Sequence, residues 1–114
     1  MNVKELQTGD YVNYRGQIIV VTSLYDKGGS NEVGWSDKEG VWVNADNVKP
    51  VRLTEVFMQK NFPTPEEIVW WPLNDGSFRV EMQDDTHLII GKYNYVHELQ
   101  HALRLFGKDG EIKL

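Results

Sequence analysis

The segment HELQH, from His97 to His101, combines the side chains that zinc hydrolases place on one turn of helix. Two histidines four residues apart project side by side from a helix, where they bind Zn²⁺. The intervening glutamate, here Glu98, acts as a base on a metal-bound water in such enzymes. A catalytic zinc needs a third protein ligand as well. The spacing is therefore typical of a metallohydrolase, provided that another part of the chain supplies the third ligand.

The remainder of the sequence offers poor candidates for that third ligand. The longer pattern HExxHxxGxxH fails, because Arg104 and Gly107 stand in its Gly and His places. Downstream, the oxygen donors are Asp109 and Glu111, which follow the break in the helix that the glycine predicts. Upstream, His87 lies in a segment that reads as a strand. The chain contains no cysteine, so a thiolate ligand is excluded.

The helical phase of the motif argues further against a metal site. Successive side chains of a helix rotate by about 100°. One side then gathers the apolar residues Tyr95, Val96, Leu99, Ala102, Leu103 and Phe106, which predicts a buried stripe. On this projection His97 and His101 lie on the opposite face, toward solvent. We therefore interpret the motif as incidental, and we predict no catalytic residue, no metal and no cofactor, which means that the protein is not an enzyme.

Length and composition indicate a small globular protein. A chain of 114 residues with 40% hydrophobic content can bury one moderate core. The first ten residues carry charges where a signal peptide has an apolar segment, and no stretch is long and apolar enough for a membrane span. Together with the lack of cysteine, this predicts a cytoplasmic protein without a membrane partner. A net charge of −5 disfavours binding through phosphates alone.

The first half of the chain reads as short strands separated by turns. The strands are predicted at residues 11–14, 17–24, 33–35, 41–43 and 48–51, with one helical turn at 44–47. Residues 17–24 are β-branched and apolar on both faces, which predicts the central strand. Five strands with a helical turn before the last, opened by GDYVNYRGQIIVV, resemble the SH3-like small barrels of the Tudor and KOW types. The resemblance covers residues 1–52 and implies a five-stranded barrel.

The second half reads as a mixed α and β unit, residues 53–114. A short helix at 53–61 begins after Thr54 as N-cap. Three strands, expected at 68–73, 77–83 and 86–90, form a β-meander in which Phe78, Val80 and Met82 share the buried face. A long helix follows at 93–106 with Gly107 as its C-cap, and 111–114 forms a last strand. The predicted fold is therefore α+β, with the barrel packed on this unit as one globular body.

Aromatic residues are the best candidates for a binding surface. Trp42 alternates with valines that fill the barrel, so it is expected on the outside. Tyr11 and Trp35 are predicted to form the binding surface together with it. Exposed aromatic rings provide large contact area at low entropic cost. These three residues predict a protein-binding module. The alternative is that the rings join the barrel to the second unit, where the neighbours Trp70 and Trp71 point to opposite faces.

Nucleic-acid binding through the barrel is the second hypothesis. It needs basic side chains gathered on one face beside stacking aromatics. The candidates in this half are Lys4, Arg15, Lys49 and Arg52. Because the whole chain is acidic, a protein partner is favoured over nucleic acid. A zinc hydrolase that uses His97 and His101 is the third hypothesis and the least favoured.

The sequence also resembles a known group of proteins along its whole length. The segments GDYVNYRGQIIVVTSLY and KYNYVHELQHALRLFGKDGEIKL look like a group of short uncharacterised proteins from gut Bacteroidetes and their phages. The resemblance implies a phage-related or mobile-element protein with no assigned activity. It also implies that Gln and Asn often stand where the zinc pattern needs Glu98 and His101.

Overall fold

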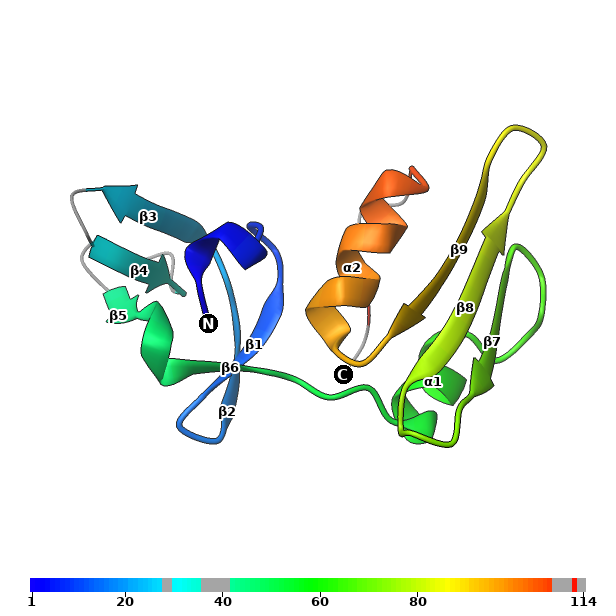
Figure 1. Cartoon of the computed structure of the whole chain (residues 1–114), viewed down its shortest axis with the longest axis horizontal. Helices are drawn as coiled ribbons and strands as arrows, with labels where there is room; N and C mark the ends of the chain where they lie inside the picture. Colours follow the sequence, from blue (N-terminus) through cyan, green and yellow to red (C-terminus); the bar gives the residue numbers. More distant parts are fainter. Residues whose placement is uncertain (28–29, 36–41, 108–111, 113–114) are drawn as a thin grey trace. The chain divides into compact units, whose positions relative to one another are not determined.

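The computed structural model describes residues 1–27, 30–35, 42–107 and 112 (Figure 1). Contacts divide the chain into two compact units, Met1–Val51 and Arg52–Leu114. Over the described residues the fold is α+β, with nine strands in three antiparallel sheets and two α-helices. No helix in this part of the chain combines the length and apolar character needed to cross a membrane.

The first sheet of the N-terminal unit has the order β2-β1-β6. Its strands are β1 (Tyr11–Tyr14), β2 (Gln17–Val20) and β6 (Val48–Pro50), all antiparallel. The corner between β1 and β2 is tight because Arg15 (φ 52°) and Gly16 (φ 83°) both adopt the left-handed conformation, and the side-chain oxygen of Asn13 accepts the Gly16 N–H at 2.9 Å. The turn predicted at residues 15 and 16 is therefore present.

The second sheet has the order β3-β4-β5, with β3 (Ser23–Lys27), β4 (Ser30–Gly34) and β5 (Trp42–Asn44). The single central strand predicted at 17–24 is wrong, because the chain turns a corner at Val21 and Thr22. The Val21 N–H donates to Asp10 O (2.9 Å), beside the first sheet, and the Thr22 N–H donates to Gly34 O (2.8 Å) in the second. β1 is the central strand of its sheet instead.

The predicted closed five-stranded barrel is also wrong, because the two sheets are open in the described part of the chain. Alternation of apolar residues predicts which strands have a buried face, whereas closure depends on tilt and stagger that alternation does not encode. The core that the sheets share is a cluster of small and branched side chains: Val3, Leu6, Val12, Ile19, Val21, Val33, Ala45 and Val48.

Two short 3₁₀ turns complete the N-terminal unit. η1 (Val3–Glu5) follows Asn2, and its Val3 N–H donates to the side chain of Asn31 at 2.9 Å. η2 (Ala45–Asn47) begins at Asn44, whose side-chain oxygen accepts the Asp46 N–H at 2.9 Å. The helical turn predicted ahead of the last strand is confirmed, with an asparagine cap as its cause.

The second unit begins with α1 (Glu55–Asn61). Its predicted N-cap is confirmed, because Thr54 Oγ1 accepts the Phe57 N–H at 3.1 Å. Phe57 and Met58 turn inward and are buried.

The meander predicted for this unit is present as the sheet β7-β8-β9, with β7 (Ile68–Pro72), β8 (Phe78–Gln83) and β9 (Leu88–Tyr93). Phe78, Val80 and Met82 are buried, as the alternation predicts. The last strand of the meander was predicted to end at residue 90, but β9 continues through Gly91 to Tyr93. A side chain at position 91 would overlap the Tyr93 ring, so glycine at this position allows the ring to lie against the strand.

α2 (Val96–Leu105) lies along β9 on one face of the meander (Figure 1). Its predicted start at residue 93 is wrong, since that residue still belongs to β9. Gly107 follows the helix with φ 93°, the left-handed conformation that a glycine C-cap provides. The strand expected at 111–114 lies outside the described residues, except for Ile112, which is buried.

Candidate functional site

The two histidines of the HExxH segment are neighbours on α2. Their ring centroids are 5.6 Å apart in an edge-to-face arrangement, and the ring of His97 also stacks on Tyr95 at 6.0 Å. His97 is only 6% exposed and His101 is half-buried. The prediction that both imidazoles face solvent is therefore wrong for His97.

Burial extends further around α2 than the apolar stripe predicts. Val96, Leu99, Ala102, Leu103 and Phe106 are buried as expected, and Gln100 is buried with them. Helical periodicity identifies the most apolar side of a helix, but it does not report how wide an arc its surroundings cover. In this helix Leu105 remains exposed.

The Glu98 side chain is hydrogen-bonded to the backbone just before its own helix. Its Oε1 accepts the backbone N–H groups of Asn94 and Tyr95, each at 3.0 Å. Two N–H groups at the start of the helix are thereby satisfied, which is the role of a glutamate at the third helical position in a capping box. The negative charge also lies at the positive end of the helix dipole. Among the described residues, His, Cys, Asp and Glu form no group of three or more that could hold a metal ion.

The clearest surface feature of the N-terminal unit is an aromatic pair on the β3-β4-β5 sheet. Tyr25 and Trp42 are 43% and 41% exposed, and their ring centroids are 6.2 Å apart with an interplanar angle of 69°. The opposite face of the same sheet carries Leu24, Val33 and Val43, which lie in one register row and belong to the core or pack against it. The pair therefore stands on the outer face.

Three neighbours on this outer face complete the platform. Glu32 lies directly opposite Tyr25 on β4 and opposite Asn44 on β5. Gly34 lies opposite Trp42, and a Cβ placed on this glycine would be 3.6 Å from the indole. That distance is an ordinary van der Waals contact, and the atom that the Cβ would overlap is Oγ of Ser23, the partner of Gly34 on β3. We call Tyr25, Glu32, Gly34, Trp42 and Asn44 the aromatic platform.

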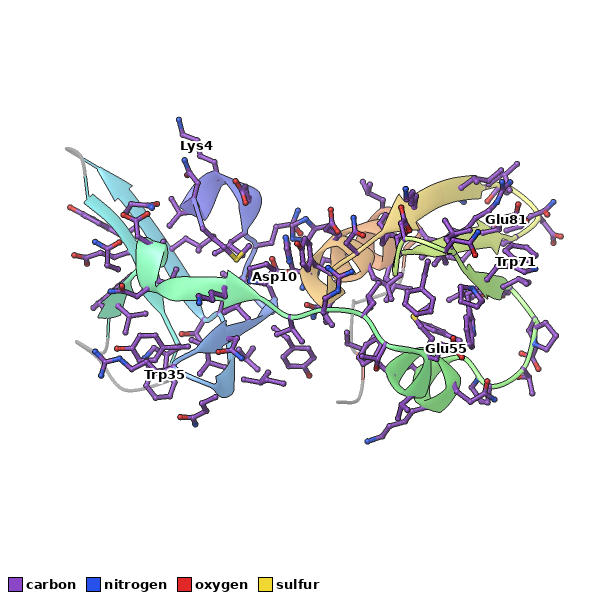
Figure 2. All side chains as sticks on the ribbon, turned by 60° about the horizontal axis from the view of Figure 1, so that its bottom comes forward. Lys4, Asp10, Trp35, Glu55, Trp71 and Glu81 are labelled. Carbon is purple, nitrogen blue, oxygen red and sulfur yellow. The ribbon has the colours of Figure 1, made fainter. Side chains whose placement is uncertain are left out.

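The three predicted binding residues do not form one surface. Trp35 shares the inner parity of Val33, is half-buried, and packs against the core beside Tyr14, with ring centroids 6.5 Å apart (Figure 2). Its indole N–H is buried and has no hydrogen-bond acceptor within the described ranges. Tyr11 is half-buried on β1, in the other sheet. Of the three, Trp42 alone belongs to the aromatic platform.

Tyr25 was missed by sequence reasoning. A single strand at 17–24 that is apolar on both faces does not indicate which face of the sheet the next residue, Tyr25, lies on. Tyr25 alternates with Leu24, and Leu24 pairs with Val33. With the corner at Thr22 known, the alternation alone places Tyr25 outside.

The basic residues proposed for nucleic-acid binding lie in different settings. The Arg15 guanidinium lies over the Tyr14 ring, 5.3 Å from its centroid. Lys4 belongs to η1 and Lys49 to β6, where both are exposed. Arg52 belongs to the second unit, where its guanidinium lies beside Gly76.

Comparison of the chain with family models, with curated proteins and with solved structures gives no match.

Proposed function

We propose that this protein is a non-catalytic interaction module that binds a protein partner through the aromatic platform. The observation that carries the proposal is the exposed edge-to-face pair of Tyr25 and Trp42 on the outer face of a sheet whose inner face is packed. Rings held in this way lose little conformational freedom on binding, so they are efficient anchors for an interface.

The chemistry of the platform favours a cationic segment as its ligand. The ring faces of Trp and Tyr attract a Lys or Arg side chain by about 0.5–1 kcal/mol at exposed sites. Glu32, directly across the strands from Tyr25, supplies a carboxylate at the distance of a cross-strand neighbour. The net charge of −5 adds a favourable long-range field for a basic partner. We therefore propose a peptide segment that carries arginine or lysine.

The capping of α2 by Glu98 supports the non-catalytic part of the proposal. A hydrolase base must reach a metal-bound water, whereas here one carboxylate oxygen of Glu98 accepts two backbone N–H groups. The glutamate of the motif then has a local explanation in helix capping.

We also propose that the N-terminal unit is related to the SH3-like folds. Extended segments that end in a 3₁₀ turn and a last strand support an SH3-like relationship for the N-terminal unit, without closure of a barrel. The resemblance to proteins of gut Bacteroidetes and their phages, and a cytoplasmic location, rest on the sequence.

Calorimetric titration with a blocked peptide of alternating arginine and glycine tests the proposed function. We expect binding to wild-type protein, a loss of about tenfold in affinity for Trp42→Ala and for Tyr25→Ala, and no binding of the same peptide with glutamate in place of arginine. Val56→Ala, which removes an exposed apolar side chain from α1, is the matched control. Equal affinities of Trp42→Ala and Val56→Ala would contradict the proposal.

A further inference from the structure

The outer face of the meander carries large apolar side chains at both edges. The side chains of Phe78, Val80 and Met82 point inward, so the alternate residues of each strand point outward. We call the outward set the meander outer face: Val69, Trp71, Arg79, Glu81, Gln83, Leu88, Ile90 and Lys92. An antiparallel sheet that faces water is normally polar on that side. Here Trp71 is 43% exposed and Ile90 is 53% exposed.

The pairing register arranges this face in three rows, and two of them hold a residue of each strand, while the third holds only Gln83 and Leu88. One row is Trp71, Arg79 and Lys92, and the next is Val69, Glu81 and Ile90. On the middle strand Arg79 and Glu81 form an ion pair at 2.9 Å (Figure 2 labels Glu81 and Trp71). On the edge strand β9, Lys92 forms an ion pair with Asp75. Each of the two full rows therefore carries an apolar residue on β7, and these two rows carry opposite charges on β8.

We propose that the meander outer face binds a second copy of this chain, with a two-fold axis that runs across the strands between the two rows. Such an axis places the row that contains Arg79 against the row that contains Glu81 in the second copy. Arg79 then faces Glu81 of the second copy, and Trp71 faces Val69 of the second copy. Each of these contacts occurs twice, once in each direction between the two copies, as an isologous interface requires.

Charge disfavours the other simple arrangement of a face-to-face pair, in which the two-fold axis runs parallel to the strands through β8. An axis parallel to the strands would place Arg79 on Arg79 of the second copy and Glu81 on Glu81. Like charges across an interface cost several kcal/mol. The axis across the strands avoids both contacts, because its central pairs have opposite sign.

The size of the face sets the strength of the association. Three strands about 4.8 Å apart and about 20 Å long give a footprint of about 300 Å² on each copy. This lies at the weak, transient end of protein interfaces. We therefore expect a dissociation constant between about 10 μM and 1 mM, with a monomer at low concentration.

Sedimentation equilibrium of the full chain from about 10 μM to 1 mM tests the proposal. R79E and E81R, each alone, place like charges in the two central contacts and should weaken dimerisation by about tenfold or more. The double variant R79E/E81R exchanges the two charges and should restore the wild-type dissociation constant. Neither Arg79 nor Glu81 is buried, and circular dichroism of each variant checks that it folds.

Leu105→Ala, which changes an exposed leucine on α2, is the control and should leave the association unchanged. A wild-type protein that stays monomeric at 1 mM overturns the proposal. So does a dimer that the single charge reversals leave intact, since pairing through the edge of β7 or β9 would not depend on these charges. The test is independent of the aromatic platform, which belongs to the other unit.

Discussion

The carboxylate of Glu98 lies at the N-terminus of its own helix, with Oε1 3.0 Å from the backbone nitrogen of Tyr95. The same oxygen accepts the N–H of Asn94 at 3.0 Å. A glutamate three positions into a helix is a common capping residue, so one letter of the HExxH pattern has a structural cause. His97 also has a structural role, because its ring is buried and stacked on the ring of Tyr95.

Removing the cap should lower stability. We expect Glu98→Ala to reduce the free energy of unfolding by about 1 kcal/mol, because two N–H groups lose their acceptor, and Glu98→Gln to reduce it less. Urea denaturation followed by circular dichroism measures the change. Glu66→Ala, at an exposed position of the connector before β7, is the control. Equal stabilities of Glu98→Ala and Glu66→Ala would show that the cap contributes nothing.

The contact between Gly91 and Tyr93 predicts a substitution whose effect depends on its neighbour. A Cβ at position 91 would overlap the phenol ring of Tyr93, so Gly91→Ala should cost about 1–2 kcal/mol. In a Tyr93→Ala background the space is open, and the same change should cost nothing or stabilise the strand. A double-mutant cycle by urea denaturation gives the coupling. Additive effects would contradict this packing.

Asp75 should make stability depend on pH in the acid range. Hydrogen bonds from Lys92 and Ser77 hold the pKa of Asp75 well below its usual range. A carboxylate with a depressed folded pKa contributes stability above its unfolded pKa of about 3.9, and the contribution is lost as pH falls through the folded pKa. Asp75→Asn should therefore be less stable than wild type at pH 7, and the gap should narrow below about pH 4.

Urea denaturation of both proteins at a series of pH values measures this gap. Asn keeps the oxygen that accepts the Ser77 N–H, so the substitution removes mainly the charge. Glu66→Gln removes one exposed carboxylate elsewhere and serves as the control. A gap that stays constant from pH 7 to pH 3 would contradict the assignment.

The nucleic-acid hypothesis makes an opposite prediction to the protein-binding one. If the N-terminal unit bound nucleic acid through Arg15 and its neighbouring rings, single-stranded RNA or DNA should be retarded at low salt, and Arg15→Ala should reduce the retardation. With an acidic chain and Arg15 packed over Tyr14, we expect no retardation. A mobility-shift assay at about 50 mM salt decides between the two.

Local chemistry made several elements predictable. The threonine cap of α1, the asparagine cap of η2 and the alternation in β8 each depend on a few neighbouring residues. The corner at Val21 and Thr22 was not predictable in this way, because both residues favour strands and the bend is fixed by hydrogen bonds to Asp10 and Gly34.

The candidate site was predictable only in part, for the same reason. The alternation of Trp42 with valines predicts that this side chain faces outward, and Trp42 is exposed in the structure. Tyr25 depends on the corner, and the inward position of Trp35 depends on which face of β4 is buried. The burial of His97 depends on contacts around the whole helix, which a single helical projection does not contain.

The most direct test of the aromatic platform is the response of individual indole N–H resonances to the arginine-glycine peptide in nuclear magnetic resonance spectra. The chain has four tryptophans, and single substitutions assign their signals. We predict that the Trp42 resonance shifts in a saturable way, that Trp70 and Trp71 do not respond, and that Glu32→Gln weakens the response. A Trp42 signal that stays fixed while the peptide binds, or a peptide that does not bind, would contradict the proposed function.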